Sequence, residues 1–165
     1  RSRCRLIRAG APTREQALEW LKSQGVQDAE RKLTEAGGMP LAVFDEDARF
    51  RLADETRERF LAYLKLGHAA PPAQALSVAD KDVTLSAAAL FLSRWGWDLA
   101  SAKVGCEPQY FPEFAEEIKT IAQAANPTGL YTWINSVRDI RRVSEHPLNA
   151  KTMIEALLIS YARNI

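Results

Sequence analysis

From residue 13 onward, apolar and polar positions alternate along the chain with the period of α-helices. Thr13 followed by Gln16 is a capping box, in which a hydroxyl and an amide satisfy free N–H groups at a helix start. Apolar residues at helical spacing follow as far as Leu21, and Gly25 is a typical residue just beyond a helix end. The pattern predicts a first amphipathic helix between Thr13 and Gly25.

Three more helices are predicted before the pattern breaks. One begins with Asp28 as its N-cap and ends near Ala36, and the next holds Pro40 in its first turn, where a missing N–H costs nothing. A longer amphipathic helix is expected over residues 46–66. The segment 67–72 then contains one glycine and two prolines, which stop a helix. We therefore expect a domain junction there.

Five helices are expected after this break: a short one near residues 73–79, one over 84–104, and three that begin at Pro112, Pro127 and Asn149. The stretch 84–104 has only three charged residues, so it should be buried on most sides. No stretch alternates long enough to form a sheet. The chain is therefore predicted to be all-α, with a small helical domain followed by a bundle of about five helices.

Charge and hydropathy exclude several classes of protein. The 165 residues carry a net charge of only +1, whereas a dedicated nucleic-acid binder usually has a strongly basic face. The basic excess lies at the N-terminal end, where residues 1–25 hold six Arg or Lys against two Glu. No apolar run is long enough to span a bilayer, and no signal-peptide pattern opens the chain. We expect a cytoplasmic protein that does not enter a membrane.

The cysteines and histidines do not predict a metal site. Cys4 and Cys106 are too few for a disulfide framework, and their spacing is not that of metal ligands, even with His68 and His146 added. Ordinary thiols of a reducing cytosol are the simpler interpretation. His146 precedes Pro147 in a predicted turn, where a structural or exposed role is expected. The sequence thus predicts no metal and no cofactor.

The sequence contains none of the common catalytic or phosphate-binding motifs. Gly37-Gly38 lacks the Lys-Ser/Thr of a phosphate-binding loop, and neither Gly-x-Ser-x-Gly nor His-Glu-x-x-His occurs. The carboxylates of Asp45-Glu46-Asp47 and Glu116-Glu117 are typical of solvated helix starts rather than of acid/base pairs. We expect this chain not to be an enzyme.

The pair Trp95 and Trp97 invites comparison with the aromatic platforms on which bases stack. Side chains two positions apart on a helix point in different directions, so the two rings cannot form one platform. Packing in the core or between domains is the favoured interpretation.

Three arginines, Arg138, Arg141 and Arg142, share one face of a predicted helix and could meet phosphates. Asp139 and Glu145 lie close enough in sequence to neutralise them. A solvated or partner-facing surface is therefore favoured, and contact with DNA is left open.

Ser2-Arg3-Cys4 resembles the Ser-Arg-Cys motif of the clamp-loader subunits of the AAA+ family. The segment Cys4–Gly25 is similar to that family's passage from the nucleotide-binding domain into the first lid helix, with a short strand at residues 4–8. In the family, the motif's arginine reaches the γ-phosphate of ATP held by a neighbouring subunit. The resemblance implies that Arg3 is an arginine finger acting in trans.

Residues 36–42 resemble the family's sensor-2 segment, in which active loader ATPases place an arginine. Pro40 stands at that position, so the resemblance implies a subunit that does not hydrolyse ATP rather than a γ/τ-type motor. Trp97-Asp98-Leu99, with Lys103 and Gly105, is similar to the middle of the family's collar domain. Residues 146–158 resemble the last helix of that domain.

The resemblance implies a C-terminal fragment of such a subunit. Residues 1–9 would be the remnant of the nucleotide-binding domain, residues 10–67 the helical lid, and residues 70–165 the collar through which subunits oligomerise. It further implies a non-catalytic scaffold in the bacterial DNA polymerase III holoenzyme, a DNA-directed DNA polymerase. Its partners would be the γ/τ and δ loader subunits, with primed DNA and the sliding clamp contacted only through the assembled complex.

Two further classes stay open beside this one and its γ/τ-type variant. The chain could be an unrelated helical interaction module, which would bind a peptide and no loader subunit. It could also be a helical DNA-binding protein, whose duplex affinity would fall steeply with salt.

Overall fold

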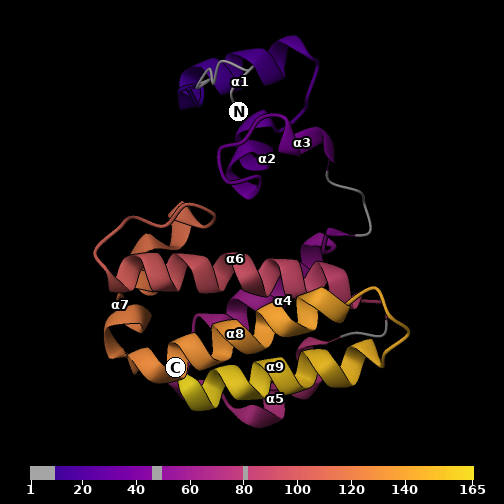
Figure 1. Ribbon diagram of the computed structural model, residues 1–165, viewed down its shortest axis with the longest axis vertical. Coiled ribbons are helices and arrows are strands. Elements are labelled where there is room, and N and C mark those ends of the chain that lie inside the picture. The colour runs from indigo at the N-terminus through magenta and orange to yellow at the C-terminus, as the bar shows by residue number, and fades with distance from the viewer. Residues whose placement is uncertain (1–9, 46–49, 80–81) are drawn as a thin grey trace, which may run out of the picture. The chain divides into compact units, whose positions relative to one another are not determined.

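The computed structural model describes residues 10–45, 50–79 and 82–165, and these residues hold nine α-helices and no strand (Figure 1). The predicted all-α class is confirmed. The chain divides into two compact units, residues 1–45 and residues 46–165. Arg3, and the short strand expected at residues 4–8, lie outside the described residues.

The first unit contains α1 (Arg14–Ser23), α2 (Ala29–Glu35) and α3 (Ala42–Asp45). The predicted capping box is confirmed, since Gln16 N–H donates to Thr13 Oγ1 at 3.3 Å and Thr13 N–H donates to Gln16 Oε1 at 3.0 Å. Six small or medium apolar side chains form the core of this unit: Ala17, Leu21, Ala29, Leu33, Ala36 and Val43.

The predicted helix ends of the first unit are mostly confirmed. Gly25 follows α1 at a φ of 74°, a left-handed conformation that favours glycine. Asp28 is the N-cap residue of α2, but its φ is 53° and its side chain makes no capping hydrogen bond. Pro40 precedes the third helix instead of lying in its first turn, because α3 begins at Ala42.

The second unit contains the remaining six α-helices, which Figure 1 shows gathered into one bundle. Their bounds are α4 (Asp54–Leu64), α5 (Pro72–Val78), α6 (Leu85–Lys103), α7 (Ala115–Ala124), α8 (Pro127–Val143) and α9 (Ala150–Asn164). Helix α6 packs against α7, α8 and α9, so the expectation that residues 84–104 form a central helix is confirmed. The five helices predicted after residue 72 are all present, each close to its predicted place.

The N-caps that the sequence predicted for the last two helices are confirmed. Asn126 Oδ1 accepts from Thr128 N–H at 2.9 Å, and Pro127 is the first residue of α8. Asn149 Oδ1 accepts from Thr152 N–H at 3.2 Å at the start of α9. These bonds satisfy N–H groups that have no partner within the helix.

The boundary between the compact units lies before α4, whereas the sequence pattern placed a domain junction after it. Phe60 and Leu64 of α4 are fully buried in the core of the second unit. Gly67, at a φ of 55°, lies so close to α7 that an added Cβ would be 3.3 Å from Ile121 Cγ1, and Ala70 is 3% exposed. The segment 67–72 is therefore a packed corner between α4 and α5.

Two aromatic side chains tie four helices of the second unit together through buried hydrogen bonds. Tyr161 of α9 donates to the Leu64 carbonyl of α4 at 2.6 Å and accepts from Trp95 Nε1 of α6 at 3.3 Å. Trp133 of α8 donates through Nε1 to the Leu157 carbonyl of α9 at 2.9 Å. Each polar atom of these rings is thus satisfied without water, as burial requires.

Helix α8 lies very close to the end of α9 at Gly129. A Cβ built on Gly129 would overlap the carbonyl oxygen of Asn164, which belongs to backbone and cannot rotate away. In an ordinary exposed helix, Gly→Ala stabilises by roughly 0.5–1 kcal/mol. Here we expect Gly129→Ala to destabilise the protein by about 2 kcal/mol, because the helices must separate and loosen buried Ile165.

Urea unfolding of Gly129→Ala beside Thr132→Ala, an exposed position on the same helix, tests this expectation. The control should change stability by less than about 0.5 kcal/mol. A stabilising effect of Gly129→Ala would show that the helix ends have room to move.

Candidate interaction surface

Asp98 of α6 is the one charged side chain that is fully buried among the described residues. Its carboxylate accepts three successive backbone N–H groups, from Gln109 at 2.8 Å, Tyr110 at 2.9 Å and Phe111 at 2.8 Å. Burial raises the pKa of the Asp98 carboxyl, while these three N–H donors act in the lowering direction. Because both oxygens are occupied, Asp98 holds the loop after α6 and is not aimed at a ligand.

The other titratable candidates do not assemble into a reactive site. Glu116 forms an ion pair with Lys119 at 3.5 Å, and Lys119 is 3.0 Å from Glu107, whose hydrogen bond raises the lysine pKa. His68 and His146 are exposed on separate segments. Among the residues that the structure describes, no three His, Cys, Asp or Glu side chains lie together as metal ligands would.

Some sequence candidates lie outside the described part. Cys4 is one of them, and Cys106 is exposed with a free thiol. The side chains of Asp45-Glu46-Asp47 are likewise not described. No helix among the described residues is long and apolar enough to cross a membrane.

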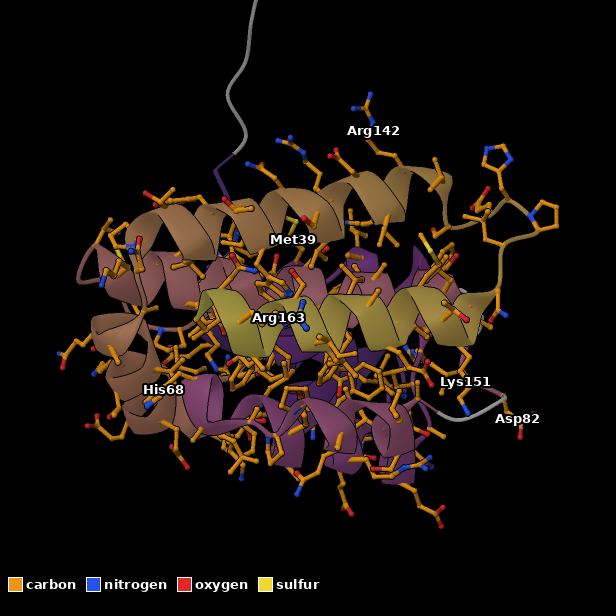
Figure 2. The ribbon with its side chains drawn as sticks, turned by 90° about the horizontal axis from the view of Figure 1, so that it is seen from below. Met39, His68, Asp82, Arg142, Lys151 and Arg163 are labelled. Carbon is orange, nitrogen blue, oxygen red and sulfur yellow. The ribbon has the colours of Figure 1, made fainter. Side chains whose placement is uncertain are left out.

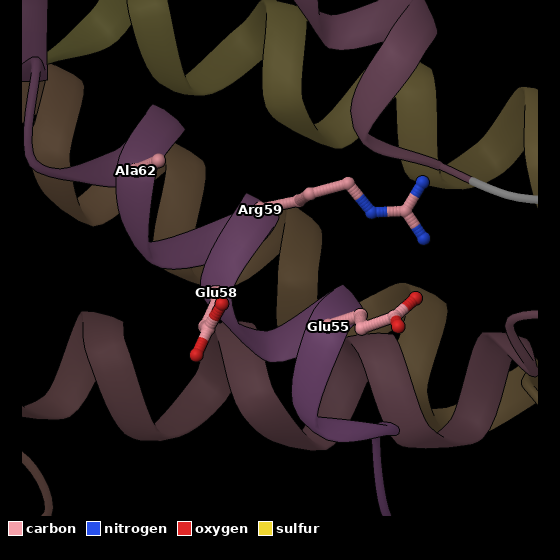
Figure 3. Close-up of a pocket in the computed structure, with 4 residues that line it drawn as sticks. All are labelled: Glu55, Glu58, Arg59 and Ala62. Atoms are coloured by element: carbon pink, nitrogen blue, oxygen red, sulfur yellow. The ribbon is translucent and has the colours of Figure 1, made fainter.

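A hollow with a volume of about 500 Å³ lies on the outer side of α4 (Figure 3). It is lined by Glu55, Glu58, Arg59 and Ala62, all from this helix. Arg59 donates to Thr56 Oγ1 at 3.1 Å. Since no second element contributes a lining residue, the hollow is an open depression on one helix rather than an enclosed substrate site.

The two neighbouring tryptophans of α6 have opposite environments. Trp95 is fully buried, which confirms the expectation of core packing for this residue. Trp97 is 58% exposed, so for this residue packing in the core is wrong, and packing between domains stays a prediction. Val104 directly follows the last residue of α6. It is seven positions, or about two turns, beyond Trp97, so it lies on the same side of the helix, and it is 70% exposed.

Helix α8 presents a second outward stripe. Tyr131 is 47% exposed, and Arg138, Arg141 and Arg142 are all exposed, as the sequence predicted for the arginines. Arg138 Nε lies 3.9 Å from Asp139 Oδ1, an exposed contact that stabilises little. Figure 2 shows Arg142 pointing away from the bundle.

Helices α6 and α8 run antiparallel and pack against each other. Trp97 follows Gly96, which touches α8, and Tyr131 lies about one turn before Ile134, which touches α6, so the two outward stripes adjoin. Ser86 near the start of α6 donates to Ser144 Oγ just after α8 at 3.0 Å, and a Cβ on Gly96 would be 3.1 Å from Ile134 Cγ1. Trp97 is therefore roughly level with Ile134. We define the α6–α8 face by its six outward residues, Trp97, Val104, Tyr131, Arg138, Arg141 and Arg142.

The α6–α8 face has an apolar end and a cationic end. Its apolar members lie level with the first half of α8, and Arg142 lies eight residues beyond Ile134, about 12 Å along the helix axis. The two helices contain only two acids, of which Asp98 is buried and Asp139 exposed. Exposed aromatic rings beside arginines are typical of protein–protein interfaces.

The first unit also exposes apolar side chains. Met39 and Leu41 are 65% and 68% exposed on either side of half-buried Pro40. The rings of Trp20 and Phe44 pack edge to face with their centroids 5.6 Å apart, and both are partly exposed. Pro40 offers no charge to a phosphate, and the position of Arg3 relative to it is not described.

The resemblance stated above depends on the sequence motifs alone. Comparisons with protein-family models, with curated proteins and with solved structures give no match to this chain.

Proposed function

We propose that this chain is part of a clamp-loader subunit of the δ′ type, a non-catalytic scaffold of the bacterial DNA polymerase III holoenzyme that works in the cytoplasm during DNA replication. The observation that carries the proposal is the α6–α8 face, an exposed apolar and cationic surface on a rigid helical bundle. The order of the motifs, from Ser2-Arg3-Cys4 through Pro40 to residues 146–158, supports the identity of the complex.

The proposed work of the chain is geometric. The buried bonds of Tyr161 and Trp133 hold α4, α6, α8 and α9 in one arrangement, so the α6–α8 face keeps its shape when a partner binds. A scaffold of this kind fixes the spacing of the neighbouring ATPase subunits. Arg3 is proposed to reach the γ-phosphate of a neighbour's ATP, where a guanidinium stabilises the developing charge.

The proposed partners are the γ/τ and δ subunits, and DNA and the sliding clamp are contacted through the assembled loader. The uncharged Pro40 at the sensor-2 position favours the δ′ type over a γ/τ-type motor. An unrelated helical interaction module is the second candidate, because an exposed Trp97 serves any protein partner equally well.

Mixing the chain with purified γ/τ-type and δ subunits, followed by size exclusion with light scattering, tests the proposal. A stoichiometric complex is expected, and Trp97→Ala should weaken it about tenfold or more, because an exposed tryptophan at an interface contributes several times the average residue. Leu76→Ala on α5, where Leu76 is 53% exposed, is the matched control and should leave assembly unchanged. Absence of any complex with loader subunits would refute the proposed function and favour the interaction module.

A further inference from the structure

We propose that the α6–α8 face binds an amphipathic helix of a partner protein, one that carries apolar side chains at one end and carboxylates about two turns away. This inference deepens the proposed function, and it rests on that function only for the identity of the partner. The chemistry of the bound helix follows from the residues of the face.

The apolar end needs a partner that removes its side chains from water. Trp97 of α6 and Val104, the residue that follows this helix, are both largely exposed. Tyr131 of α8 lies three positions before Ile134, with which Trp97 is level. Burial of exposed apolar area of this kind is the main favourable term in protein association. An aromatic ring with a polar edge is also the commonest anchor of an interface.

The cationic end specifies the charge of the partner. Arg141 and Arg142 have no ion pair recorded among the described residues, and the contact of Arg138 with Asp139 is long and exposed. Arginine matches a carboxylate with two parallel hydrogen bonds, which gives register as well as attraction. Glutamate or aspartate side chains on the partner therefore complement this end.

The dimensions of the face fit a helix. Val104 is roughly level with Asn126, the residue before α8, so the face extends from Asn126 to Arg142. At the rise of an α-helix this length is about 24 Å, which a partner helix of about 16 residues would cover. A third helix packs well along the groove between two packed helices, because its side-chain ridges fit into grooves of this kind.

A protein helix fits this face better than a nucleic acid does. Phosphates would require cations along the whole length, whereas Val104, Trp97 and Tyr131 occupy one half of it. The chain also carries a net charge of only +1, which gives little of the long-range attraction on which such binding depends.

The test has two arms, both with the full 165-residue chain. In the first, fluorescence anisotropy follows the binding of a labelled 18-residue helical peptide with leucines in one half and glutamates in the other. A scrambled peptide and a peptide with lysines in place of the glutamates are compared with it. The protein variants are Trp97→Ala, the double reversal Arg138→Glu with Arg142→Glu, and the matched reversal Lys151→Glu with Arg163→Glu on α9.

The glutamate peptide should bind the wild type more tightly than the scrambled one. We expect the double reversal on α8 to weaken the glutamate peptide at least about tenfold and to strengthen the lysine peptide, and Trp97→Ala to weaken both about tenfold. The reversal on α9 should leave the affinity unchanged. Equal affinity for the scrambled peptide, or no effect of the α8 reversal, would overturn the inference.

In the second arm, the same variants are mixed with loader subunits. Assembly that survives both face variants would leave the proposed function standing and overturn the inference. Peptide binding without any loader complex would refute the proposed function and leave the inference standing. Two further outcomes overturn the inference: duplex DNA that displaces the peptide, and a dimer that Trp97→Ala dissolves, which would make a second copy the occupant of the face.

Discussion

Replacing Asp98 with asparagine is expected to lower the free energy of unfolding by about 3 kcal/mol. The carboxylate offers oxygens alone, and they accept from the backbone N–H groups of Gln109, Tyr110 and Phe111. Asparagine has nearly the same shape, but it must turn an N–H₂ group toward one or more of these donors. At least one buried donor then loses its acceptor and meets a repulsive partner.

The loss should be local before it is global. Hydrogen exchange at residues 109–111 should accelerate at urea concentrations that leave the rest of the bundle protected, because Asp98 is the group that fastens this loop to α6. Asp139→Asn makes the same chemical change at an exposed site of α8 and should alter stability by less than about 0.5 kcal/mol. Equal stability of the two variants would show that the loop is held by its aromatic contacts alone.

Those aromatic contacts are substantial. Phe111 packs edge to face against Phe91 and Trp95 of α6, with centroids 5.2 and 5.4 Å apart. Arg94 lies over the Tyr110 ring at 5.7 Å. The comparison of Asp98→Asn with Asp139→Asn therefore separates the carboxylate's contribution from the packing of the rings.

The helices could be predicted because their starts are encoded locally. Thr13, Asn126 and Asn149 each accept a backbone N–H within three residues, so neighbouring sequence suffices to place them. The charge-poor stretch 84–104 likewise predicts a central helix, since its composition reflects burial on most sides.

The boundary of the compact units could not be read from the same signals. The glycine and the two prolines of residues 67–72 indicate that a helix ends, but they are equally compatible with a linker and with a tight corner. The corner is set by contacts distant in sequence, such as Gly67 against Ile121 of α7 and Phe60 against Phe91 of α6. Contacts between residues that are distant in sequence cannot be predicted from the local pattern of apolar and polar residues.

Only part of the α6–α8 face could be predicted from the sequence. The arginine stripe of α8 follows from helical spacing alone, and its exposure is confirmed. That Trp97 faces solvent beside this stripe depends on the antiparallel pairing of α6 with α8 and on Gly96, which lets Ile134 approach closely. The role of Asp98 was missed, although a single acid in a charge-poor helix is a signal for a buried, hydrogen-bonded carboxylate.

Tyr161→Phe is expected to destabilise the protein by about 3 kcal/mol, although it removes a single oxygen atom. The hydroxyl donates to the carbonyl of Leu64, the last residue of α4, where carbonyls have no partner within the helix. It also accepts from Trp95 Nε1. Phenylalanine therefore leaves one buried donor and one buried acceptor without partners, and each costs about 1–3 kcal/mol.

Urea unfolding of two further Tyr→Phe variants makes this prediction specific. Tyr63 donates at 3.3 Å to the Leu158 carbonyl in the middle of α9, which a helical N–H can also serve, so Tyr63→Phe should cost about 1 kcal/mol. Tyr131 is exposed, and Tyr131→Phe should change little. The expected order follows how many buried partners each hydroxyl satisfies. If Tyr161→Phe matched Tyr131→Phe, water would have to reach Leu64 and Trp95, and the rigidity on which the scaffold proposal depends would be lost.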